Sequence, residues 1–303
     1  MRYSNYYLIL TFFVANLFLS SCAVHREPSP EAVSNYNPLL SRVMIDFSIF
    51  AYLKTEDELN KELSLKYQNF TLLKRINEDE NPYDSQAFVA YDDYKVIVAV
   101  RGSSSFQDWF NNLKVGKFTN KDTLGYCQYA AMHGGFHLSA RYLKNAKISQ
   151  DNSITVASEI YRLQKEGRKV YFTGHSLGGA VANVLAFFAS YESDIIVDGV
   201  YTFGEPRNGN DSYLSCHDTK LRTKTFRFIN NRDVVSRIPP FGNYHQVGNL
   251  IYFDRYGNIT TQNVNDGWFY MTFDVLIGRF ARDHFKESYL ELIQQHKFTN
   301  PFP

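Results

Sequence analysis

The sequence has little surplus charge, few cysteines and one long apolar run. Its 32 lysines and arginines nearly balance 31 aspartates and glutamates, so the formal net charge is +1. A near-neutral chain without a long basic run offers nucleic acid no electrostatic attraction. Hydrophobic residues make up 44% of the chain and charged residues 21%, a balance typical of folded rather than disordered proteins. We therefore expect a globular protein that does not bind nucleic acid.

Cysteine occurs only three times, as Cys22, Cys127 and Cys216. No Cys/His spacing resembles a zinc site, so we expect no metal. If Cys22 is modified, as argued next, the other two remain as a candidate disulfide in an oxidising compartment. Their pairing stays open here, because a sequence does not show whether two Cα atoms lie within bridging distance.

The long apolar run covers residues 8–19 and follows a single charge at Arg2. It is too short to span a bilayer comfortably, but it has the length of the apolar part of a secretory signal peptide. The ending LSSC, which finishes at Cys22, resembles the lipobox of bacterial lipoproteins, in which the cysteine is acylated and becomes the new N-terminus. The alternative is an ordinary signal peptide with an incidental cysteine.

We therefore expect a lipoprotein signal peptide over residues 1–21 and a tether over residues 22–37, with a lipid anchor on Cys22. Ala23 stands where such lipoproteins carry an aspartate when they are retained in the inner membrane. The sequence thus favours an exported protein anchored to a bacterial membrane, the outer rather than the inner one.

From residue 38 to residue 303 the hydrophobic pattern alternates between helical and strand periods. This alternation, without a break in composition, predicts one α/β domain. The expected helices cover residues 38–50, a stretch after Thr55, 151–166, 177–188 and 285–295. The expected strands cover residues 70–74, 86–91, 94–100, 170–173, 197–203 and 224–229, with a hairpin formed by 251–253 and 259–261.

A candidate nucleophile lies in the segment GHSLG, residues 174–178, which fits the G-x-S-x-G pattern. A buried strand precedes it and an apolar helix follows it, as a nucleophile elbow requires. Ser176 would then lie at the N-terminal end of a helix, where developing negative charge is stabilised. The backbone N–H of Leu177 would be one donor to that charge. A glycine-rich turn without chemical function is the alternative.

The acid and the base follow from the order of an elbow triad, which is serine, then acid, then histidine. Asp233 comes just after the strand at 224–229, at the sheet edge where open α/β sheets gather their active sites. His284 opens the last helix and is favoured as the base over His245, which we interpret as a structural histidine. A turn-capping role is the alternative for Asp233.

Four segments together resemble the class 3 lipase family of α/β-hydrolases. They are RGSSSFQDW at 101–109, AMHGGF at 131–136, TGHSLGGA at 173–180 and TFGEPR at 202–207. The resemblance covers roughly residues 38–300 and implies a mixed, mostly parallel central sheet, no cofactor and ester hydrolysis through an acyl-enzyme. It also implies that Ser103 supplies the second oxyanion donor through its backbone N–H, helped by its hydroxyl.

A candidate lid follows Ser103. Its apolar residues have helical spacing and are Phe106, Trp109, Phe110 and Leu113. Such a helix would cover the site in water and open onto lipid; a surface helix packed on the core is the alternative. The family usually has an acidic residue near position 112, where this chain has Asn112, which weakens the assignment of the lid but not of the triad.

The sequence thus predicts a lipid-anchored serine carboxylic ester hydrolase that cleaves acyl glycerols with Ser176, Asp233 and His284. A phospholipase A1 is the alternative among enzymes, since the same triad cleaves either lipid. A catalytically silent lipoprotein that binds lipid or protein partners is the alternative from another class. The sequence does not indicate an oligomeric state or a role for residues 263–281.

Overall fold

The computed structural model describes residues 28–77, 85–103, 117–119, 127–148, 153–239, 243–261, 280–297 and 299–302. The expected signal peptide and Cys22 lie outside the described residues. The same holds for the candidate lid residues Phe106, Trp109, Phe110 and Leu113.

A mostly parallel sheet forms the centre of the described domain. Its strands are β1 (Thr71–Ile76), β2 (Ala87–Tyr91), β3 (Lys95–Val100), β6 (Lys169–His175), β7 (Val197–Phe203), β8 (Thr225–Asn230), β9 (Asn249–Phe253) and β10 (Ile259–Thr260). They are hydrogen-bonded in the order β1-β2-β3-β6-β7-β8-β9-β10. The strands from β3 to β9 run parallel, and antiparallel strands extend the sheet at both edges. A separate two-stranded sheet pairs β4 (Lys117–Thr119) with β5 (Ala131–His133).

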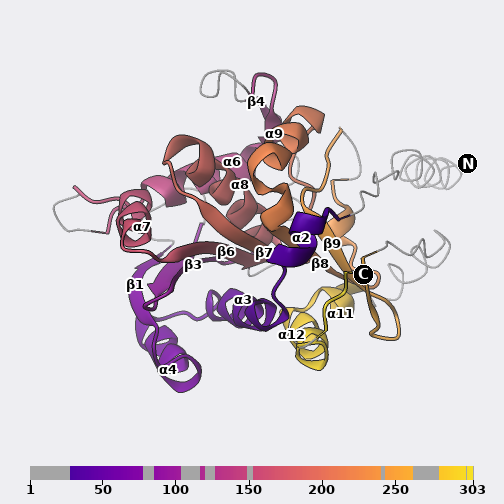
Figure 1. The fold of residues 1–303 in the computed structure, drawn as a ribbon, viewed down its shortest axis with the longest axis horizontal. Helices are drawn as coiled ribbons and strands as arrows, with labels where there is room; N and C mark the ends of the chain where they lie inside the picture. Colours follow the sequence, from indigo (N-terminus) through magenta and orange to yellow (C-terminus); the bar gives the residue numbers. More distant parts are fainter. Residues whose placement is uncertain are drawn as a thin grey trace, which may run out of the picture.

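Helices cover both faces of this sheet (Figure 1). One face carries α6 (Gly134–Asn145), α7 (Val156–Lys165), α8 (Leu177–Glu192) and α9 (Asp211–Leu221), and the other carries α3 (Pro38–Phe50), α4 (Glu56–Lys66) and α12 (Lys286–Gln295). The described elements also include α2 (Pro30–Asn35), α11 (Phe280–His284) and short 3-10 turns at Arg222–Lys224 and Val235–Arg237. Each face has its own hydrophobic core, and the core under α3 is rich in aromatic rings. The predicted α/β architecture is therefore confirmed.

Local signals explain several helix boundaries. Thr55 and Glu58 form a capping box at the start of α4, the helix expected after Thr55. A second capping box, between Thr155 and Ser158, starts α7. That helix therefore begins at Val156, later than the expected start at residue 151.

The helix α8 follows the elbow and is buried along almost its whole length. It packs against the sheet on one side and against α6 on another, so an apolar residue is favoured on nearly every face. Within the described residues no helix combines the length and the hydropathy needed to cross a bilayer.

Part of the expected tether is structured. Residues 30–35 form α2, with Ser29 as its N-cap and Pro30 in its first turn. Ala32 is fully buried, and the ring of Tyr36 packs edge-on against Phe226 at a centroid distance of 5.2 Å. The packed domain therefore begins before residue 38, because the prolines and polar residues of this stretch start a short helix rather than a linker.

The structure pairs the two remaining cysteines. Cys127 and Cys216 form a disulfide with their Cα atoms 5.8 Å apart. This bond joins the segment before β5 to α9, across 89 residues of sequence. The question that the sequence left open is thus answered in favour of a bridge.

Candidate active site

Ser176 lies on a sharp turn between β6 and α8 at the centre of the sheet. Its backbone has φ 59° and ψ −132°, a conformation that residues with a side chain rarely adopt. The turn places Ser176 at the N-cap of α8, as the G-x-S-x-G pattern predicts. Ser176 is buried, with 7% of the residue exposed.

The glycines of the motif allow the close packing around this turn. A side chain at Gly174 would overlap the backbone of Gly178, and a side chain at Gly178 would overlap the carbonyl of Val100. The two glycines thus let the elbow pack against itself and against the end of β3.

His284 lies between Ser176 and Asp233 and hydrogen-bonds to both. Its Nε2 is 2.8 Å from Ser176 Oγ, and its Nδ1 is 2.8 Å from Asp233 Oδ2. A carboxylate only accepts hydrogen bonds, so Nδ1 carries the proton and Nε2 accepts the serine O–H when the ring is neutral. The three residues predicted from chain order therefore form one continuous hydrogen-bonded chain.

Asp233 is fully buried and receives further hydrogen bonds that fix its orientation. The backbone N–H of Val235 donates to Oδ1 at 2.9 Å, and the hydroxyl of Tyr289 donates to Oδ2 at 2.7 Å. Tyr289 is itself held by the N–H of Asn230, at 3.0 Å. Sequence reasoning missed Tyr289, since nothing local connects a tyrosine of α12 with a carboxylate 56 residues earlier.

Gly204 makes room for the acid and the base. It has φ +62°, and a side chain there would lie 2.7 Å from Asp233 Oδ2 and 3.0 Å from the ring of His284. Both the positive φ and the close approach require glycine at this position. The sequence signal for this position is the glycine of the TFGEPR segment.

The two predicted oxyanion residues lie on segments beside Ser176. Leu177 is the first residue of α8, so its N–H belongs to the unpaired donors at the helix start. Ser103 comes three residues after the end of β3, and its neighbour Gly102 approaches within 3.3 Å of the Ser176 Cβ, measured from an ideal Cβ on the glycine. The segment that follows Ser103 lies outside the described residues.

His245, the alternative histidine, is not part of the hydrogen-bonded series formed by Ser176, His284 and Asp233. His245 Nε2 is 2.6 Å from Asn243 Oδ1 and 2.9 Å from Asp211 Oδ1. Asp283, the neighbour of His284, accepts hydrogen bonds from the Asn231 side chain and the Arg232 backbone. Both residues thus have structural partners of their own.

A second carboxyl group, Glu205, is fully buried behind the elbow. The Thr202 hydroxyl donates a short hydrogen bond to Oε2, and Gly179 of α8 packs against the Glu205 Cβ. Burial raises the pKa of Glu205 from 4.5 to about 7, although Thr202 and the nearby Arg227 act in the opposite direction. Nothing in the sequence around Glu205 predicts this buried acid.

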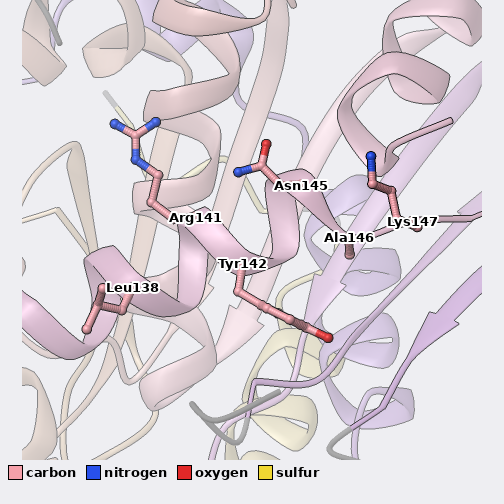
Figure 2. A pocket seen from close by; sticks show the side chains of 6 residues that line it. All are labelled: Leu138, Arg141, Tyr142, Asn145, Ala146 and Lys147. Atoms are coloured by element: carbon pink, nitrogen blue, oxygen red, sulfur yellow. The ribbon is translucent and has the colours of Figure 1, made fainter. Parts of the chain in front are cut away.

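A shallow hollow of about 400 Å³ lies beside α6, apart from these residues. Figure 2 shows the side chains that line it, which are Leu138, Arg141, Tyr142, Asn145, Ala146 and Lys147. Arg141 forms an ion pair with Glu192, and its guanidinium lies 4.1 Å from the centre of the Phe188 ring. The lining holds no nucleophile paired with a base, so the triad remains the candidate active site.

Comparison with known proteins supports the assignment of an α/β fold. Residues 97–243 match the family model described as lipase (class 3). The secreted mono- and diacylglycerol lipase 1 of Fusarium solani is 33% identical over 163 residues, which are 52% of this chain and 45% of that protein. Phospholipase A1-II 1 of Oryza sativa subsp. indica is 30% identical over 177 residues, which are 52% of this chain and 43% of that protein.

The chain thus spans less than half the length of these relatives. Among solved structures, the triacylglyceride lipase of Rhizomucor miehei superposes with a TM-score of 0.56 at 20% identity, over 80% of this chain and 89% of that one. Residues 97–243, which contain the elbow and Asp233, are therefore similar to the class 3 lipase family, and the chain has a single-domain α/β-hydrolase fold.

Proposed function

We propose that this protein is a serine carboxylic ester hydrolase that cleaves acyl glycerols. The observation that carries the proposal is the hydrogen-bonded chain from Ser176 through His284 to Asp233, with both bonds at 2.8 Å. This series of hydrogen bonds starts at the N-terminus of α8, where backbone N–H groups favour the negative charge that develops during acyl transfer.

In the proposed reaction Ser176 Oγ attacks the acyl carbonyl while His284 Nε2 takes the hydroxyl proton. The N–H groups of Leu177 and Ser103 hold the tetrahedral oxyanion. The intermediate collapses to an acyl-enzyme, and Nε2 returns its proton to the departing alcohol. Water then attacks the acyl carbon while His284 Nε2 takes a proton from it. Nε2 returns this proton to Ser176 Oγ, which releases the fatty acid and restores the serine. Asp233 holds the imidazole tautomer and stabilises its positive charge.

Acyl glycerols are the proposed substrate class because of the activities for which the two matching relatives are named. The Fusarium protein is named a mono- and diacylglycerol lipase and the Oryza protein a phospholipase A1. The same triad serves both lipids, so phospholipid hydrolysis is the second candidate.

The test is fatty-acid release by the mature domain from emulsified triacylglycerol and from phosphatidylcholine vesicles, with Ser176→Ala as the blank. We expect serine-dependent release mainly from triacylglycerol. A preference for the vesicles would replace the lipase by a phospholipase. Release that persists in the Ser176→Ala protein would contradict the serine mechanism altogether.

We further propose that the protein is exported and anchored by a lipid on Cys22. The apolar run at 8–19 and the LSSC ending support this proposal. The Cys127–Cys216 disulfide is typical of oxidising compartments, and the Fusarium relative is named as secreted.

The Cys22→Ser protein is expected to leave the membrane fraction and appear as a soluble species, since one acylated cysteine would be its anchor. Fractionation followed by immunoblotting measures this, with Ser34→Ala at an exposed position of α2 as the control variant. A Cys22→Ser protein that stays with the membrane would show that the anchor lies elsewhere.

A further inference from the structure

A second series of hydrogen bonds runs through the site and ends on the backbone of His284 rather than on its ring nitrogens. The hydroxyl of Tyr52, just after α3, is 2.9 Å from His175 Nδ1. The other ring nitrogen of His175, Nε2, is 2.7 Å from the carbonyl oxygen of His284. The two imidazole rings lie against each other, with centroids 4.7 Å apart and an interplanar angle of 33°. The residue before the nucleophile thus contacts the backbone and the ring of the proposed base.

The chemistry of the partners fixes the direction of this chain. The carbonyl of His284 only accepts, so His175 Nε2 carries a hydrogen and donates it. Burial, followed by the neighbouring His284, holds the pKa of His175 well below 6.5, which keeps the ring neutral. A neutral ring has a single N–H, so Nδ1 is the acceptor and the Tyr52 hydroxyl is the donor.

The other end of the chain contacts the oxyanion segment. Gly102 packs so closely against the Tyr52 hydroxyl that a side chain on the glycine would overlap it. The guanidinium of Arg101 and the ammonium of Lys286 lie 5.8 and 4.8 Å from the centre of the Tyr52 ring. Tyr52 therefore contacts the segments on either side of the nucleophile, one leading to Ser103 and one following His284.

We propose that Tyr52 and His175 are positioning residues that hold the oxyanion segment and the backbone of His284 in a fixed relation to Ser176. The proposal rests on the serine hydrolase function proposed above. It assigns a role to His175, which neighbours the nucleophile in sequence but cannot serve as its base, since its two nitrogens are occupied by Tyr52 and the His284 carbonyl.

The test measures the rate at which a fluorophosphonate labels Ser176, because this rate reports the activated serine without requiring the natural substrate. The Tyr52→Phe variant keeps the ring beside Arg101 and Lys286 and removes only the hydroxyl. We expect its labelling rate, and its kcat for a soluble short-chain ester, to fall about 10-fold with KM within twofold, the change expected for loss of about one hydrogen bond. Tyr213→Phe is the matched control, because Tyr213 is also buried and its hydroxyl has no hydrogen-bond partner among the described residues.

Variants of His175 give the second measurement. The amide of His175→Gln can still donate to the His284 carbonyl, whereas His175→Leu cannot. We expect the glutamine variant to retain most of the labelling rate and the leucine variant to lose at least as much as Tyr52→Phe. Unfolding in urea, measured for each variant, separates loss of folded protein from loss of rate.

A wild-type protein that is labelled, with Tyr52→Phe labelled at the same rate, would overturn this inference and leave the proposed function standing. A rate that falls only in proportion to the folded fraction would also overturn it, since Tyr52 would then have a purely structural role. A wild-type protein that is not labelled at all would contradict the proposed function, and the positioning role with it.

Discussion

Replacement of Ser176 by glycine is expected to abolish hydrolysis and, at the same time, to stabilise the protein relative to the alanine variant. Either substitution removes the proposed nucleophile, and the loss of a catalytic serine lowers kcat by about 10⁶-fold. The two variants differ in the backbone. At φ 59° and ψ −132° a Cβ is strained, and such strain costs on the order of 1–3 kcal/mol. Glycine relieves it, whereas alanine does not.

Urea unfolding of the two variants side by side measures the difference. We expect Ser176→Gly to exceed Ser176→Ala by about 1 kcal/mol in unfolding free energy, after the entropic cost of a glycine is subtracted. At an ordinary backbone position glycine is less stable than alanine by about 0.5–1 kcal/mol. A glycine variant that is less stable than the alanine variant would therefore show that the elbow is not strained.

Buried Glu205 is expected to make the protein lose stability as the pH rises. Its pKa is raised from 4.5 to about 7 in the folded state, chiefly by burial, so the folded protein binds a proton that the unfolded chain releases. The contribution of Glu205 is fully present below pH 4.5, declines as the pH rises towards 7 and is lost above 7. Across this range it amounts to about 3 kcal/mol of unfolding free energy.

Other buried groups titrate in the same pH range. The contribution of Glu205 therefore has to be measured as the difference in unfolding free energy between wild type and a Glu205 variant. Burial lowers the pKa of His137 to about 4, which makes stability rise with pH between about 4 and 6.5. Comparison of wild type with Glu205→Gln cancels this opposing contribution. We expect the two proteins to have similar unfolding free energies at pH 4.5 and the glutamine variant to be more stable at pH 8. Exposed Glu291 supplies the control Glu291→Gln, for which no such gain is expected.

Parallel curves for wild type and Glu205→Gln between pH 4.5 and 8 would contradict this account. They would mean that Glu205 keeps its charge when buried, with Arg227 as the compensating cation.

The elbow could be predicted because its determinants are local. Ser176, its two glycines, the strand before it and the helix after it are contiguous in sequence, and their steric requirements are the same in any such fold. Asp233 and His284 were reached by chain order and by the place where their strand or helix begins or ends. The order of the elements and the points where they begin and end belong to the topology of the fold, which the hydrophobic pattern of the sequence predicts.

The rest of the site depends on packing between distant segments. Tyr289 reaches Asp233 across 56 residues and Tyr52 reaches His175 across 123, and neither tyrosine has a distinctive local setting. Among the helices, α6 was missed because it begins with Gly134 and Gly135, which are typical of a turn. The prolines around α2 were interpreted as a tether for a similar reason, although Pro30 occupies the first helical position.

The chain is synthesised from its N-terminus, so the late position of His284 in the sequence determines when the active site can form. Ser176 lies at the middle of the sheet, whereas α11 and α12, with His284 and Tyr289, follow all of its described strands in sequence. The helix α12 packs against α3, so the layer that closes the site joins early and late segments of the chain. While the protein is being synthesised, its serine therefore remains without a base after the sheet-forming residues are complete. The proposed ester hydrolase therefore stays inactive until the segment with His284 has been made.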